Sequence, residues 1–474
     1  MARRIWRWDG RGFVPRPPGR DDEAFFETVA DLATAGEILD LPPLWDHHGH
    51  LAALGATFEE LDLRGCETLE EALDAVRIEA QGLPPEAWIL GSGWDQTRWG
   101  GAFPGREALD AASGDHPAFL LRVDHHAAWA NSAALRIAGI DGATPDPPGG
   151  AILKEAAAPT GILLDTAAEI VEAAVPPPSE DSLPERLEKA MQAVRSAGLS
   201  GVTDMKLSRT DLRLIERLDR ARGLPLPVEG YLDSPPEPGE GKALFRRGRA
   251  FRLAGAKIFV DGALGSRGAA LHEPYSDAPE TRGILLYDRR ELAAVLEGCR
   301  REGMPPALHA IGDLAVSLAL DAADAAGLAP GFRIEHLQVI RREDRHRLET
   351  SGAVASLQPS HLLTDAHWGR LRLGDRFPSA YPLGSLAARG IPILLGTDFP
   401  IEPALPCRTL FAALSRTPES ERLDPAGAFR AMAPPPWSDA VGARTLAAGD
   451  PLLPGSPPDV VLEWRLAARP DRTP

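Results

Sequence analysis

Three of the chain's twelve histidines fall within four consecutive residues, in the stretch LPPLWDHHGHLAALG that begins at Leu41. His48 and His50 end an apolar run of the kind that forms a β-strand. Residues i and i+2 of a strand point to the same side, so both imidazoles can reach one cation. Alone, a His-x-His pair is weak evidence for metal binding, and further ligands must come from elsewhere in the chain.

Further candidates stand at the ends of later apolar runs. They are Lys257 in AKIFVDG, His309 in PPALHAIGD, His336 in FRIEHLQ and Asp398 in IPILLGTD. Neutral imidazoles and carboxylate oxygens are the ligands of hydrolytic metal sites. A lysine ammonium has no lone pair to donate, but a lysine carboxylated by CO₂ carries a carbamate that bridges two cations.

Each of these residues also has a structural interpretation. The later histidines suit hydrogen-bonded strand ends, Lys257 can pair with Asp261, and Asp398 suits an Asx turn before a proline. The joint pattern favours a metal site, because six reactive residues end five different runs.

Eight apolar runs that end in polar residues predict the elements that position this set. They are LPPLWDHHGH, GVTDMK, LPVEGYL, RLAGAKIFVDG, PPALHAIGD, FRIEHLQ, AVASLQPS and IPILLGTD. From the second run onward the spacing suits one strand–helix unit each. We therefore predict an α/β fold, a (β/α)₈ TIM barrel whose active site lies at the carboxyl ends of the strands.

The gap between the first and second runs is much longer than the others. It holds strand-like AWILGSGWD and AFLLRVDHH and helix-like TLEEALDAVRIEAQG, which predicts an inserted subdomain after strand one. At the amino end, RRIWRW and RGFVP flank Asp9-Gly10, a two-residue hairpin signal, and SPPDVVLEWRL at the other end reads as a strand. The terminal strands are expected to pair with each other outside the barrel.

These elements predict three segments. Residues 1–40 and 446–474 would form a small β-sandwich, and residues 41–445 the barrel, with the insertion at about 60–198.

Composition narrows the class of protein. The formal net charge is −17 and the basic residues form no stripe, which disfavours nucleic-acid binding. The chain has no apolar run long enough to span a membrane, and MARRIWRWDGRGF lacks the apolar core of a secretory signal, so a cytoplasmic location is expected. Cys66, Cys299 and Cys407 lie far apart, which supports neither a disulfide framework nor a zinc ribbon.

Several motifs in order resemble one family. GSGWDQTRW, RVDHHAAWANSAAL, PPGGAI, PTGILLD, GVTDM, KIFVDGALGSR, HAIGD, RIEHLQV, SLQPSH and GTDFPIEP are similar to those of the metal-dependent amidohydrolase superfamily, in its YtcJ-like (amidohydrolase-3) branch. The resemblance runs from about Leu41 to Pro403. It implies a (β/α)₈ barrel with a small β-sandwich built from both termini.

The resemblance also implies a ligand set and its roles. His48 and His50 would bind one metal ion and His309 and His336 the other, with Lys257 as an N-carboxylated bridge and Asp398 as ligand and proton shuttle. The divalent metal is expected to be zinc, as one or two ions, and we favour two. Asp46 would orient a ligand histidine from behind, while His47 points to the other face and is structural.

The predicted reaction is hydrolysis of an amide-type C–N bond by a metal-activated hydroxide, with Asp398 as proton shuttle. The candidate substrate contacts are Trp94, Asp95, Arg122, His126, Arg267 and His361. Two of these have structural alternatives: Trp94 as core of the insertion, and Arg267 as partner of a structural carboxylate.

Two rival functions stay open. One is a deaminase or esterase on the same scaffold, and the other is a non-catalytic protein that binds a metal or a small molecule. The expected partner is a small-molecule substrate, with no nucleic acid and no membrane, and the resemblance adds a homodimer.

Overall fold

The computed structural model describes residues 4–8, 13–16, 37–96, 98–122, 127–147, 150–176, 182–244, 248–436, 438, 444–448 and 464–467. The chain divides into two compact units, Met1–Leu54 with Pro184–Pro474, and Gly55–Leu183. In the described ranges, no helix combines the length and apolar character needed to cross a membrane. Each unit is considered by itself.

Eight parallel strands, neighbours in chain order, form the main sheet of the first unit. They are β4 (Leu44–Gly49), β11 (Leu199–Leu207), β12 (Val228–Leu232), β13 (Phe251–Phe259), β14 (Pro306–Ala310), β15 (Arg333–His336), β16 (Val354–Leu357) and β17 (Ile393–Leu395). Each overlaps one of the eight runs named above, which confirms the predicted strands.

The first and last strands meet and close this sheet. Gly49 forms a parallel bridge with Phe399, the Asp398 N–H donates to the His48 carbonyl at 2.7 Å, and the His50 N–H donates to the Phe399 carbonyl at 2.9 Å. The predicted (β/α)₈ barrel is thus confirmed, and the closing bonds lie beside the residues expected to bind metal.

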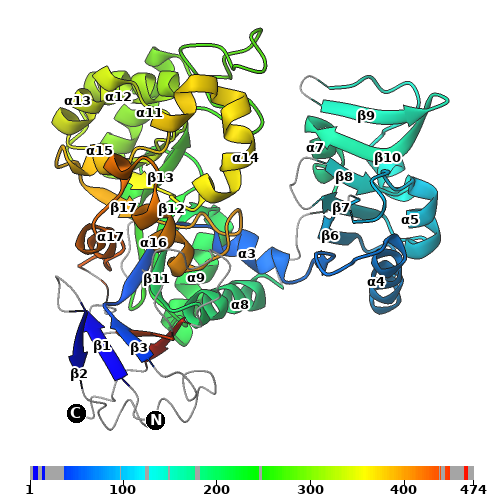
Figure 1. Cartoon of the computed structure of the whole chain (residues 1–474), viewed down its shortest axis with the longest axis horizontal. Helices are drawn as coiled ribbons and strands as arrows, with labels where there is room; N and C mark the ends of the chain where they lie inside the picture. The colour runs from blue at the N-terminus through cyan, green and yellow to red at the C-terminus, as the bar shows by residue number, and fades with distance from the viewer. Residues whose placement is uncertain are drawn as a thin grey trace. The chain divides into compact units, whose positions relative to one another are not determined.

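Helices alternate with the strands and surround them (Figure 1). Those of eight or more residues are α8 (Leu183–Ser196), α9 (Arg209–Ala221), α11 (Arg289–Glu302), α12 (Asp313–Ala326), α13 (Arg342–Ser351), α14 (His361–Leu373) and α16 (Pro406–Ser415). The shorter ones are α3 (Leu51–Thr57), α10 (Glu240–Leu244), α15 (Gly384–Ala387) and α17 (Pro425–Ala431).

Local sequence explains where helices begin and end. At α11, Asp288 and Glu291 form a reciprocal capping box, and Gly303 ends the helix in the left-handed conformation. Ser208 and Asp211 form the same box at α9. These caps satisfy backbone groups that the helix itself leaves without partners.

Large side chains and small ones alternate inside the barrel. Trp45 is fully buried and its indole N–H donates to the Thr203 hydroxyl at 3.0 Å. Gly201 faces this ring, and a Cβ at that position would lie 2.1 Å from it. The strand interior therefore needs a glycine here for close packing.

The second unit has its own sheet and core. The sheet order is β5 (Leu61–Asp62), β6 (Ile89–Trp94), β7 (Ala118–Arg122), β8 (Ala127–Ala130), β10 (Ala158–Asp165) and β9 (Gly150–Glu155). The helices are α4 (Leu69–Gly82), α5 (Arg106–Ser113), α6 (Ser132–Ile137) and α7 (Thr166–Glu172). The predicted large insertion after strand one is thereby confirmed.

Strands from both ends of the chain form a five-stranded sheet in the order β19-β18-β3-β1-β2. They are β1 (Arg4–Trp8), β2 (Phe13–Arg16), β3 (Glu37–Leu41), β18 (Arg444–Ala448) and β19 (Trp464–Ala467), drawn in blue and red in Figure 1. The amino- and carboxyl-terminal segments pair directly, β3 antiparallel to β18, as expected from the sequence for the terminal strands.

One detail of the terminal region differs from the prediction. Trp8 pairs with Phe13, so four residues separate the hairpin strands rather than the two of the Asp9-Gly10 signal. Those four residues lie outside the described ranges. The predicted boundaries of the three segments stay a prediction.

Candidate metal centre

The barrel brings together all six residues that the sequence singles out as ligands. His48 lies on β4 and His50 directly follows it, Lys257 lies on β13, His309 on β14, His336 ends β15, and Asp398 follows β17. His336 and Asp398 have φ values of 76° and 65°, in the left-handed region that costs most residues free energy. Backbone strain of this kind clusters at functional sites, where surrounding contacts hold it.

Asp398 lies close to four of the imidazole rings at the site. Its Oδ1 lies 2.9 Å from His50 Nε2 and 3.5 Å from His48 Nε2, and its Oδ2 lies 3.1 Å from His361 Nε2 and 3.9 Å from His336 Nδ1. Two ligands each about 2.1 Å from a tetrahedral cation would stand about 3.4 Å apart. Two sets of side chains therefore have ligand spacing: His48, His50 and Asp398, and His336, His361 and Asp398.

Lys257 is buried at the centre and does not make the structural contact considered for it. Its Nζ lies 3.4 Å from His48 Nε2. The Asp261 carboxylate instead accepts backbone N–H groups from Ala270, Ile311 and Gly312. Burial lowers the pKa of Lys257 to about 8, against the opposing charges of carboxylates in the barrel. Carboxylation by CO₂ needs the neutral amine, which this shift favours.

Buried imidazole nitrogens without partners fit a cation. Among the described residues, His309 Nε2 and His336 Nδ1 have no hydrogen-bond partner, although buried polar atoms nearly always have one. Burial lowers the pKa of His48 to about 4 and that of His309 to about 3, with the charge of Lys257 acting in the same direction. These rings are neutral at physiological pH, which is the form that binds metals.

The two residues before His48 have separate structural roles. The Asp46 carboxylate accepts the backbone N–H of His48 at 3.0 Å and both the N–H and the hydroxyl of Thr397, at 3.1 and 2.7 Å. Asp46 thus fixes the His48 backbone and joins β4 to β17, rather than holding an imidazole ring. His47 Nε2 lies 3.0 Å from the Ala433 carbonyl oxygen, away from the centre, in keeping with its structural interpretation.

Sequence reasoning missed the residue that holds the His48 ring. Glu335 Oε2 lies 2.7 Å from His48 Nδ1, and Arg333 Nε donates to Glu335 Oε1 at 2.7 Å. All three side chains are buried. Although burial opposes ionisation, the charge of Arg333 and the contact with His48 hold the pKa of Glu335 well below its usual range. The available signal was RIEH itself, in which Arg333 and Glu335 alternate with an apolar residue on a short strand.

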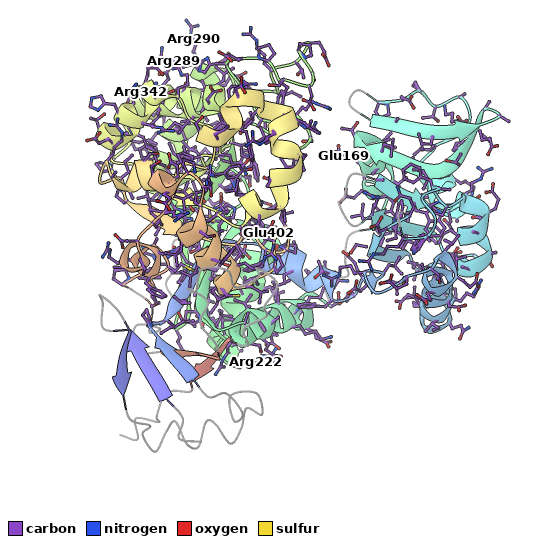
Figure 2. The ribbon with its side chains drawn as sticks, in the orientation of Figure 1. Glu169, Arg222, Arg289, Arg290, Arg342 and Glu402 are labelled. Carbon is purple, nitrogen blue, oxygen red and sulfur yellow. The ribbon has the colours of Figure 1, made fainter. Side chains whose placement is uncertain are left out.

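His361 lies closer to the predicted ligands than a substrate contact requires. It is the first residue of α14, and the Thr364 hydroxyl in the same turn donates to its carbonyl at 3.0 Å and to the buried Glu402 at 2.5 Å. Glu402 is labelled in Figure 2, in the segment after β17. Burial acts to lower the pKa of His361, but its hydrogen bond to Asp398 and the negative charges of Asp398, Asp365 and Glu402 together raise it.

Arg267 has the structural partner considered for it. Its Nη2 lies 3.0 Å from Asp277 Oδ2, and Arg372 contacts the same carboxylate.

The remaining candidate substrate contacts belong to the second unit. Trp94 is fully buried there, its indole N–H donates to the Leu120 carbonyl at 2.8 Å, and it packs against Trp99 and Trp129. This is the core role considered for it. Asp95 and Arg122 form an ion pair at 3.3 Å, and His126 lies outside the described residues. Substrate contact by these residues stays a prediction.

Comparison with known proteins agrees with the fold and the site. Residues 39–438 match the family described as "Amidohydrolase family". The putative amidohydrolase YtcJ of Bacillus subtilis is 34% identical over 407 residues, which cover 83% of this chain and 76% of that protein. The chain therefore belongs to the amidohydrolase family, a family of hydrolases, and the resemblance read from the sequence is confirmed.

More distant relatives extend the comparison. The N-substituted formamide deformylase of Arthrobacter pascens is 25% identical over 427 residues, 82% of this chain and 77% of that enzyme. A crystal structure of an uncharacterised metal-dependent hydrolase from Pyrococcus furiosus superposes with a TM-score of 0.73 at 28% identity, over 96% of this chain and 99% of that one.

Proposed function

We propose that this protein is a metal-dependent hydrolase that cleaves an amide-type C–N bond in an N-substituted amide or a related small molecule. The observation that carries the proposal is the convergence of four histidines, Lys257 and Asp398 at one end of the barrel, with two buried imidazole nitrogens, His309 Nε2 and His336 Nδ1, left without partners among the described residues. Two relatives support it: one is named as a deformylase of N-substituted formamides and the other as a metal-dependent hydrolase.

The residues fit a divalent cation, which we propose to be zinc. His48, His50 and Asp398 would hold one ion, and His309 and His336 a second, with N-carboxylated Lys257 between them. The closeness of Lys257 Nζ to His48 and the lowered pKa of its amine support this assignment. A bound cation would lower the pKa of a water molecule and polarise the substrate carbonyl.

Asp398 is the residue proposed to move the proton. Burial opposes its ionisation, but interactions with His48, His361 and His50 hold its pKa well below the usual range, so it is a carboxylate before the reaction. It would accept a proton from the attacking water and deliver it to the departing nitrogen. His361, hydrogen-bonded to Oδ2, would keep the carboxylate aimed during this transfer.

A substrate panel tests the proposal. Purified protein reconstituted with zinc would be offered N-substituted formamides, acyl amino acids, cyclic amides, a purine and an aryl ester. We expect the release of amine from at least one amide class at a kcat/KM well above that for the ester, and loss of that activity in Asp398→Asn. Release of ammonia from the purine alone, or cleavage of the ester alone, would favour the rival activities and overturn the assignment to an amide bond.

A further inference from the structure

A buried polar network lies behind His48. Glu335 Oε2 is 2.7 Å from His48 Nδ1, and Arg333 reaches both oxygens of that carboxylate, at 2.7 Å from Nε to Oε1 and 3.3 Å from Nη2 to Oε2. Arg333 is 3% exposed, and Glu335 and His48 are 0% exposed. Hydrogen bonds between ionised groups without water are stronger and shorter than neutral ones.

Arg333 is itself held from several sides. Its Nη2 donates to the His47 carbonyl at 2.6 Å and to the Ser356 hydroxyl at 2.8 Å, and its guanidinium lies 5.2 Å from the centre of the Tyr231 ring. Arg333 therefore holds the carboxylate of Glu335 in place and neutralises its charge, which buried groups cannot leave to water.

This network sets which nitrogen of His48 carries the proton. Because Glu335 is an acceptor, Nδ1 must be the donor, and the lone pair of the neutral ring lies on Nε2. Nε2 is the atom that faces the centre, 3.4 Å from Lys257 Nζ and 3.5 Å from Asp398 Oδ1. A carboxylate behind a ligand imidazole also makes that ligand more basic.

The other candidate ligands lack this support. The distal nitrogen of His50, Nδ1, has no hydrogen-bond partner among the described residues. His309 Nε2 lies 3.7 Å from Oδ1 of the buried Asp261, which is beyond hydrogen-bonding distance. Among the described candidate ligands, only His48 has a buried carboxylate within hydrogen-bonding distance of the ring nitrogen that faces away from the centre.

We propose that Arg333 and Glu335 are positioning residues which act through His48, so that the cation position of His48 and His50 is the tightest in the centre. The proposal rests on the metal-binding part of the proposed function. Neither residue touches the cation or the substrate. Together they fix the tautomer, the orientation and the basicity of one ligand before any metal arrives.

The test measures zinc affinity of the full-length protein by competition with a chromophoric chelator, in wild type and in Glu335→Gln. The substitution keeps the shape of the side chain and removes its charge. We expect the tightest equivalent of zinc to bind about 10- to 100-fold more weakly, the usual cost of losing such a partner.

A matched control is Asp344→Asn, on α13. Asp344 is 0% exposed and accepts from Ser317 Oγ at 2.6 Å, Arg341 Nε at 3.1 Å and Arg347 Nη1 at 3.0 Å. It tests the effect of neutralising a buried, hydrogen-bonded carboxylate away from the centre. Zinc affinity should be unchanged in this variant, even where its thermal stability falls.

A double variant tests whether weaker zinc binding in Glu335→Gln comes only from misfolding. Glu335→Gln leaves the charge of Arg333 buried without a counter-charge, whereas Arg333→Met with Glu335→Gln leaves neither charge. The double variant should regain thermal stability and still bind the tightest zinc weakly.

Three results would overturn the proposal. The first is that the tightest equivalent of zinc binds Glu335→Gln as tightly as wild type, and the second is that only a more weakly bound equivalent of zinc loses affinity in Glu335→Gln. The third is that Asp344→Asn loses as much zinc affinity as Glu335→Gln. Absence of zinc binding by the wild type would instead refute the proposed function itself, and the proposal with it. Nitrogen-15 spectra of the metal-free protein give a second readout, since the His48 Nδ1–H resonance should shift in Glu335→Gln and not in Asp344→Asn.

Discussion

Single residues at the carboxyl end of the barrel carry the chemistry, and Asp398 connects them. Its two oxygens face imidazoles that come from β4, β15 and α14. A left-handed backbone conformation presents the carboxylate to all of them. The residue thus combines contacts expected of a ligand with the position expected of a proton carrier.

Replacing Asp398 with Asn should separate these two roles. The amide retains the shape and one oxygen but cannot take up a proton, so we expect kcat to fall by about 10² to 10⁴, the usual contribution of general acid–base catalysis. Zinc content would change little. Steady-state kinetics with elemental analysis of the same preparation measures both, and a near-normal kcat would contradict the assignment.

Lys257 should react with CO₂ in a pH-dependent manner. Burial lowers the pKa of its amine from 10.5 to about 8, so the neutral, reactive fraction rises roughly tenfold per pH unit below 8 and levels off above it. At a fixed concentration of dissolved ¹³CO₂, we expect the rate of its incorporation into metal-free protein, followed by the carbamate signal in ¹³C NMR, to show this profile. Lys257→Met should show no signal. A rate that keeps rising to pH 10 would argue for an ordinary exposed lysine.

The six ligand candidates could be predicted because each ends an apolar run, and the ends of parallel strands meet at one edge. The contact between Glu335 and His48 could not. β15 pairs with β14 and β16, whereas His48 comes from β4, so the two side chains meet across the barrel interior. The closeness of His361 to Asp398 likewise depends on how α14 begins, which Glu402 and Thr364 decide through tertiary contacts.

At the scale of elements, the eight barrel strands were evident as apolar runs, even though β17 has only three residues. Alternation and spacing are local properties of the sequence, and so is the capping chemistry of α9 and α11. Closure between β4 and β17 is not local. Closure depends on the Asp46 carboxylate, on the backbone hydrogen bonds beside Asp398, and on Gly396, which leaves room for β4 to approach β17.

Gly396→Ala should damage both the barrel and the metal centre. A Cβ at this position would lie 2.4 Å from His48 N and 2.6 Å from His48 Cβ, so β17 and β4 must separate. We expect a loss of about 1–3 kcal/mol in the free energy of unfolding, as overpacking usually costs, together with weaker zinc binding.

The control is Gly230→Ala on β12, where the added Cβ would lie 2.3 Å from Leu207 Cδ1 and no candidate ligand stands nearby on the strand. It should lose stability and keep its zinc affinity. Denaturant unfolding and chelator competition measure the two effects, and equal losses of zinc affinity in both variants would contradict the special role of Gly396.

At the scale of the whole molecule, the chain has two units, each with its own sheet. The candidate ligands all belong to the barrel unit, while the second unit has an aromatic core around Trp94 and Trp129. Ligands that bind only the folded state stabilise the unit that holds them.

Removal of metal should therefore affect only part of the thermal unfolding. We expect calorimetry to show two transitions, one of which falls on chelation, while the other falls in Trp129→Ala, since truncating a buried aromatic side chain costs about 3–5 kcal/mol. A single transition that shifts as a whole on chelation would contradict independent unfolding of the units.

The most direct test of the central claim is the metal content of the protein, measured by elemental mass spectrometry after purification in bicarbonate without added metal, beside Lys257→Met. We expect close to two equivalents of zinc or a similar ion in the wild type and a clear fall in the variant. One equivalent that the variant leaves unchanged would assign Lys257 to structure. No metal, and none taken up on incubation, would contradict the metal centre and leave a non-catalytic binding protein as the better interpretation.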